Sequence, residues 1–120
     1  MKFDLDKEGL ETVLLPWQLE VIRFVWSTGE VNSRSAWSHL EGTEYAMSRA
    51  SVINFLNEMV DEGFIVYEEA TGKGGYHRIY SPAPGVNGEE VFKEKVIEKI
   101  LVKIKSEFSN ERDLFDNENV

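Results

Sequence analysis

Hydrophobic residues recur at helical spacing after Leu15, where a polar stretch of the chain ends. Pro16 suits the first turn of a helix, and Gly29 suits the position just beyond its end. Steps of three and four residues between the apolar positions therefore predict a helix over about residues 16–28. These apolar positions are Leu19, Ile22, Val25 and Trp26.

Two further helices are predicted between residues 33 and 62. Ser33 can cap a short helix whose inward residues are Ala36, Trp37 and Leu40. Ser48 can cap a longer helix, which we expect to run to Glu62 and to stop at Gly63. Its apolar stripe consists of Val52, Leu56, Met59 and Val60, with Phe55 beside it.

Beyond Gly63 the hydrophobic period changes from about 3.6 toward 2. Residues 64–69 and 76–81 are rich in aromatic and β-branched side chains, which favours two strands. Residues 70–75 lie between them and contain three glycines, so they predict a flexible turn. The segment as a whole predicts a β-hairpin.

A final amphipathic helix is predicted over residues 89–108, after Pro82 and Pro84 interrupt the chain. Its apolar stripe is longer than a domain of about 70 residues needs to cover, so we expect the helix to pack against its twin in a two-fold dimer. Packing on the chain's own first helix is the alternative. The predicted interface residues are Val96, Ile97, Ile100, Leu101, Ile104 and Phe108.

The order of three helices followed by a hairpin with a glycine-rich tip is that of a winged helix-turn-helix domain. We therefore predict an α+β fold, mainly helical, with a winged-helix DNA-binding domain over residues 15–84. A C-terminal dimerisation helix follows over residues 85–110, and residues 1–14 and 111–120 are expected to be flexible ends. In such domains the third helix enters the major groove of DNA and the wing touches the backbone or the minor groove.

The net charge of the whole chain opposes DNA binding, but the local charge of one segment does not. Asp and Glu number 22 against 13 Lys and Arg, which gives a formal net charge of -9. Phosphate contacts draw on Lys and Arg, but surface potentials act over only about 10 Å at moderate salt. Residues 71–85 contain the basic residues Lys73, His77 and Arg78 and no acidic residue. The hairpin is therefore locally basic.

Other function classes find little support in the residues. The chain has no cysteine and two histidines, which argues against disulfides, thiol catalysis and a metal site. No convergent acid–base arrangement occurs, so we expect no enzymatic activity and no cofactor. The acidic N-terminus does not resemble a signal peptide and no apolar run is long enough to span a membrane, so a cytoplasmic protein is expected.

Nine residues are candidates for contacts with double-stranded DNA. On the third helix Arg can bond guanine, Asn can bond adenine, and Ser can reach bases or phosphates. On the wing and at the start of the second helix, polar side chains can bind the phosphate backbone of the DNA. For each of them the alternative is a solvated surface residue, and for the first serine it is a helix cap. They are Ser48, Arg49, Ser51 and Asn54 on the third helix, Lys73, His77 and Arg78 on the wing, and Arg34 and Ser35 on the second helix.

The sequence resembles the penicillinase-repressor family of the BlaI/MecI type and, more loosely, the MarR-type regulators. The resemblance lies in LPWQLEVIRFVW from Leu15, SVINFLNEMVDEGFI from Ser51 and YHRIYSPA from Tyr76. It implies a dimeric repressor that binds an inverted-repeat operator. The alternative function is a winged helix that binds other proteins within a larger assembly.

Overall fold

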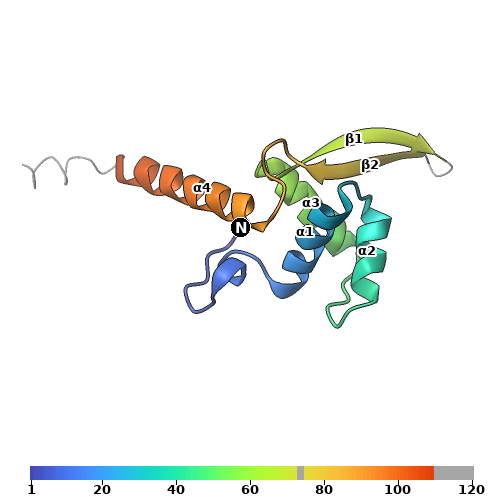
Figure 1. The fold of residues 1–120 in the computed structure, drawn as a ribbon, viewed down its shortest axis with the longest axis horizontal. Coiled ribbons are helices and arrows are strands. Elements are labelled where there is room, and N and C mark those ends of the chain that lie inside the picture. Colours follow the sequence, from blue (N-terminus) through green and yellow to red (C-terminus); the bar gives the residue numbers. More distant parts are fainter. Residues whose placement is uncertain (73–74, 110–120) are drawn as a thin grey trace, which may run out of the picture.

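The computed structural model describes residues 1–72 and 75–109, which form four α-helices, a short 3-10 helix and one antiparallel hairpin (Figure 1). The order of elements confirms the predicted α+β fold. Helices and hairpin together form a winged helix, in which the hairpin lies along one side of the helical core. The elements are η1 (Gly9–Thr12), α1 (Pro16–Thr28), α2 (Ser33–Glu41), α3 (Arg49–Asp61), β1 (Ile65–Gly72), β2 (Gly75–Pro82) and α4 (Glu89–Ser109).

The helix ends lie close to the predicted positions. Gly29 ends α1 with a φ of +88°, and Gly63 follows α3 with a φ of +85°, conformations that glycine adopts without steric cost. Ser48 caps α3 by accepting a hydrogen bond from the backbone N–H of Ser51 at 3.2 Å. The cap of α2 differs from the prediction, since it is Asn32 that accepts from Ser35 N–H at 2.8 Å, and Ser33 is the first helical residue.

The hairpin is longer than the two predicted strands. Its antiparallel register runs from Ile65 opposite Pro82 to Gly72 opposite Gly75, so only residues 73 and 74 separate the paired ends. Ala70 and Thr71, expected in the turn, pair in the ladder with His77 and Tyr76. This hairpin is the wing referred to below.

The core forms where the apolar stripes of the three domain helices meet the base of the wing. Most of the predicted stripe residues on α1 and α3 are buried, as are Phe64 and Ile65 where the chain enters β1, whereas Trp26 and Val60 are partly buried against this core. No polar or charged residue of the described chain is buried. Among the residues that the three helices contribute to this core are Leu19, Ile22, Val25, Ala36, Leu40, Val52, Phe55, Leu56 and Met59.

Residues 1–14 do not form the loose lead-in that the sequence suggested. Leu10, Val13 and Leu14 are buried in the common core, and the backbone N–H of Asp4 donates to the carbonyl of Thr12 at 2.7 Å. The apolar residues of this segment are spaced too irregularly to stand out as an amphipathic helix, which is why the pattern did not reveal them. The predicted domain therefore gains this N-terminal segment. Residues 111–120 lie outside the described part of the chain.

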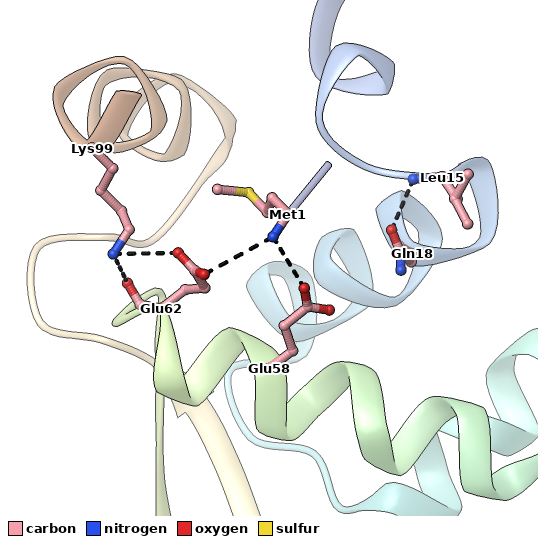
Figure 2. A network of polar contacts seen from close by, with 6 residues as sticks. All are labelled: Met1, Leu15, Gln18, Glu58, Glu62 and Lys99. Carbon is pink, nitrogen blue, oxygen red and sulfur yellow. Dashed lines mark hydrogen bonds and ion pairs between the residues drawn. The ribbon is translucent and has the colours of Figure 1, made fainter. Parts of the chain in front are cut away.

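Polar contacts join the N-terminal segment, the end of α3 and α4 (Figure 2). The amino group of Met1 donates to Glu58 Oε1 at 3.1 Å and lies 3.9 Å from Glu62 Oε1. Lys99 Nζ of α4 donates to the backbone carbonyl of Glu62 at 2.7 Å and lies 3.4 Å from its carboxylate. The first half of α4 is thus held against the end of α3.

The first two turns of α4 belong to the domain core, which corrects the predicted boundary at residue 85. Phe92 is fully buried, and its ring lies 5.4 Å from that of Trp26 and 4.5 Å from that of Phe64. Val96, assigned from sequence to the dimer face, is only 5% exposed and belongs to this core, with Ile100 packed partly against it. Farther along, α4 projects from the domain (Figure 1), and Ile97, Leu101, Val102, Ile104 and Phe108 are exposed.

Replacing Phe92 with alanine should lower the free energy of unfolding by about 3–5 kcal/mol, because the substitution leaves a cavity between α1, α4 and the wing base. Urea denaturation followed by circular dichroism measures this change. Val102→Ala on the same helix is the control, since Val102 is 63% exposed and surface truncations cost about 0.5 kcal/mol or less. Equal effects of the two substitutions would show that α4 does not belong to the core.

Candidate nucleic-acid interface

The N-termini of α2 and α3 and the tip of the wing surround a surface hollow of about 500 Å³. We call it the basic hollow. The hollow brings together residues from three segments that are far apart in the sequence. Its lining consists of Asn32, Ser33, Arg34, Arg49, Gly75, Tyr76 and His77.

No carboxylate of residues 1–72 or 75–109 lines the basic hollow, although acids outnumber bases in the chain. Within residues 1–72 and 75–109, neither Arg34 nor Arg49 has an ion pair or a side-chain hydrogen bond, and both side chains are exposed. Several other cations pair with acids of the same surface, among them Arg23 with Glu89 at 2.8 Å. On α4 the lysines that form ion pairs are Lys93, Lys95, Lys99 and Lys103.

Two helix N-termini border the basic hollow and add to its positive potential. Arg34 is the second residue of α2 and Arg49 is the first residue of α3. The first N–H groups of a helix lack intrahelical partners and carry partial positive charge, which favours an anion beside them. The hollow is therefore suited to a phosphate group.

Three of the predicted DNA-binding serines take part in helix caps. Ser35 donates its hydroxyl to the Asn32 carbonyl at 3.0 Å and accepts from Asn32 N–H at 3.1 Å. The Ser48 hydroxyl donates to Ser51 Oγ at 2.9 Å and accepts from the Ser51 N–H. These bonds fix the entrances of α2 and α3 beside the two arginines. Asn54 lies one turn along α3, exposed and outside the lining of the hollow.

The wing residues divide between the basic hollow and α3. His77 is exposed and lines the hollow, whereas Arg78 is half-buried and donates from Nη1 to Asn57 Oδ1 of α3 at 2.9 Å. The Arg78 guanidinium also lies 4.0 Å above the ring of Tyr67. Lys73, the third predicted wing residue, lies outside the described residues. The structure thus unites Arg34, Arg49 and His77, but places Arg78 elsewhere.

Apart from Gly75, which has no side chain, three residues that line the hollow were missing from the candidates. Tyr76 is 80% exposed, and an aromatic residue beside a glycine-rich turn could have been noticed as a candidate. Asn32 and Ser33 precede and begin α2, and placing the cap one residue too late concealed their position. Asn32 and Ser33 lie beside Arg49 and the wing because of tertiary packing, and no local sequence pattern predicts such a contact.

Tyr80 connects the wing to α3 and to the segment before α2. Its hydroxyl donates to Asn57 Oδ1 at 2.7 Å, and its backbone pairs with Val31 in both directions, at 2.7 and 2.9 Å. Burial raises the pKa of the Tyr80 hydroxyl, and Arg78 opposes this rise only in part. Tyr80 therefore remains a protonated donor at neutral pH.

These features define the protein as a winged helix, and solved structures with the same fold agree. The structure of PadR from Bacillus subtilis in complex with operator DNA matches with a TM-score of 0.56 and 15% identity over 67% of this chain. A protein from Thermoplasma acidophilum, proposed to be a transcriptional regulator, matches with a TM-score of 0.51 and 14% identity; the match covers 80% of this chain and 88% of that one. The chain spans 45% of the PadR chain.

No protein-family model and no curated protein matches the sequence. The resemblance noted in the sequence is confirmed for the winged-helix fold. Neither solved structure is described as a penicillinase repressor or a MarR-type regulator, so that narrower resemblance stays a prediction. Within residues 1–72 and 75–109, no helix is long and apolar enough to cross a membrane, and no group of three or more His, Cys, Asp or Glu side chains could hold a metal ion.

Asn32→Ala should lower the free energy of unfolding by about 1 kcal/mol, because it removes the cap of α2 at the edge of the basic hollow. Thermal or urea unfolding measures the loss. Ser33→Ala, one residue along the same turn, is the matched control and should have a smaller effect, since Ser33 makes no cap bond. An equal loss for both would mean that Asn32 does not cap the helix.

Proposed function

We propose that this protein is a sequence-specific DNA-binding transcriptional regulator that acts as a homodimer. The observation that carries the proposal is the basic hollow of a chain with a net charge of -9. In the part of the chain that the structure describes, this hollow contains two arginines without an ion-pair partner and no carboxylate. The winged-helix fold supports it, because the hollow lies at the N-terminus of the helix that such domains insert into the major groove. PadR, which has the same fold, has been solved with operator DNA.

The candidate contacts take different roles in this proposal. Arg49 and Asn54, exposed on α3, are placed to read base edges, with Ser48 and Ser51 beside them. Arg34 holds a backbone phosphate at the start of α2, where Ser35 fixes the cap. On the wing, His77 and Lys73 contact the backbone or minor groove. Arg78 has one nitrogen bonded to Asn57, so a direct phosphate contact would use its remaining donors.

The acidic surface outside the basic hollow shapes how DNA is bound. Nonspecific affinity arises mainly from many phosphate contacts and the counterions that they release. With few unpaired cations and a repulsive net charge, the protein should bind random duplexes poorly. Its specific complexes should also show a shallow dependence on salt for a dimeric regulator.

The exposed half of α4 supports the homodimer. Ile97, Leu101 and Ile104 are all at least 43% exposed on one side of a helix that projects from the domain (Figure 1). Such an apolar stripe is costly in water, and a two-fold partner would cover it. Two wings related by a two-fold axis fit an inverted-repeat operator, where a repressor acts by occupying the site. We propose no enzymatic activity or cofactor, and a cytoplasmic location where DNA is accessible.

Binding other proteins is the rival function, and one observation favours it. The outer strand of the wing, β1, exposes Val66 and Tyr67 beside Glu68 and Glu69. An exposed edge with mixed apolar and acidic side chains fits a protein partner better than a phosphate backbone.

Arg49→Ala and Asn54→Ala should each cost about 1–3 kcal/mol on the preferred DNA sequence and relax the preference at one position, because each removes a base contact. The sequence is first selected from random DNA by the wild-type protein and should be an inverted repeat. Binding is then measured by fluorescence anisotropy.

Arg34→Ala is the matched comparison for these two substitutions. It should weaken binding to all sequences alike and reduce the salt slope by about one counterion, because it removes a phosphate contact. Selection of no sequence at low salt, or binding unchanged by all three substitutions, would contradict DNA recognition and favour the protein-binding function.

A Leu101→Glu/Ile104→Glu double variant should sediment as a monomer at micromolar concentration, whereas the wild type sediments as a dimer. The two carboxylates would have to be buried unpaired in the interface. Ser106→Glu, on the opposite side of the same helix, adds a similar charge and should leave the dimer intact. A wild-type protein that is itself monomeric would refute the assembly.

A further inference from the structure

One oxygen atom of α3 receives two hydrogen bonds from the wing. Asn57 Oδ1 accepts from Arg78 Nη1 at 2.9 Å and from the Tyr80 hydroxyl at 2.7 Å. Arg78 and Tyr80 are two residues apart on β2, so their side chains leave the same face of the strand. Among residues 1–72 and 75–109, no backbone hydrogen bond links α3 to either strand of the wing, so the two bonds to Asn57 are directional contacts that the backbone does not supply.

Neighbouring contacts hold these two donors in place. The Arg78 guanidinium lies over the ring of Tyr67, which stands opposite Tyr80 in the ladder with ring centres 6.2 Å apart. Tyr80 is 2% exposed, and its backbone pairs with Val31 just before α2. Asn57 thus joins a cluster that connects α3, both strands and the segment leading to α2.

The direction of this contact matters for the basic hollow. An isolated two-stranded hairpin is marginally stable and needs packing to hold its orientation. Apolar packing at the wing base is not directional, whereas a hydrogen bond loses strength steeply when its angle changes. Tyr76, two residues before Arg78, leaves the same face of β2, so fixing Arg78 toward α3 also places Tyr76 at the hollow, which it lines together with His77.

We propose that Asn57 is a positioning residue for DNA binding, which sets the angle of the wing on α3 and thereby places the wing tip beside Arg34 and Arg49. Asn57 itself touches no DNA in this arrangement. The inference rests on the proposed function, because the position of the wing matters only if the basic hollow receives DNA.

Asn57→Leu tests the proposal, since leucine has a similar size and shape but accepts no hydrogen bond. It should weaken binding to the preferred sequence about 10-fold, because it removes both hydrogen bonds to Asn57, one of them charge-assisted. Tyr80→Phe removes only one of the two donors and should weaken binding about 3-fold by the same reasoning. Asn87→Leu, the same change at an exposed asparagine outside the cluster, is the control and should leave affinity unchanged.

A distance measurement separates positioning from a general loss of folding. The chain has no cysteine, so Ser38→Cys on α2 and Thr71→Cys near the wing tip can carry two nitroxide labels at exposed positions. Pulsed electron resonance should give one narrow distance distribution for the labelled wild type. Asn57→Leu should broaden or shift it, and Asn57→Asp, which restores an acceptor for both donors, should return it to the wild-type form.

The outcomes distinguish this proposal from the proposed function. An altered distance together with weaker binding supports it, provided that circular dichroism shows Asn57→Leu to be folded. An unchanged distance, or an altered distance with unchanged affinity, overturns it while DNA binding stands. A wild-type protein that selects no DNA sequence removes the proposed function, and the positioning role falls with it.

Discussion

The burial of Tyr80 is the contact on which the rest of the candidate interface depends. Its ring fills space at the base of the wing, its backbone pairs with Val31, and its hydroxyl reaches Asn57. One residue therefore ties the wing to α3 and to the segment that begins α2. The junction thereby connects the wing to both helices whose N-termini border the basic hollow.

The electrostatic character of the protein follows from how its charges are paired. On α4 and around its base, lysines and an arginine face carboxylates at 2.8–3.5 Å, and exposed pairs of this kind add little to stability. Their consequence is to neutralise those cations, while Arg34 and Arg49, beside two helix N-termini, have no ion-pair partner among the described residues. A strongly acidic chain can therefore present a local anion site, because screening limits the reach of its distant acids.

The local elements could be predicted from the sequence because their signals are local. Pro16 and Gly29 bound α1, Ser48 caps α3 and Gly63 ends it, and each acts through the backbone of its own turn. The candidate arginines were also identified, because an arginine on the first turn of a helix is visible in the pattern.

The burial of individual residues and the contacts between distant segments could not be predicted, because they depend on tertiary packing. Phe92 and Val96 are spaced four residues apart, as are Ile97 and Leu101, yet the first pair lies in the core and the second, on another side of α4, is exposed. Periodicity identifies apolar sides of α4 but does not tell which of them packs on the domain. Asn57 resembles any polar helix residue until the hairpin register sets Arg78 and Tyr80 opposite it, and Leu10 and Leu14 lie in a segment without a regular period.

The most direct test of the account is an NMR titration of the labelled protein with the DNA duplex that it selects, followed through its backbone amide signals. The account predicts that the largest changes fall on Ser33, Arg34, Arg49 and Tyr76, with smaller changes along the exposed side of α3. Changes confined to the outer strand β1 or to α4, with the signals of the basic hollow unmoved, would contradict it.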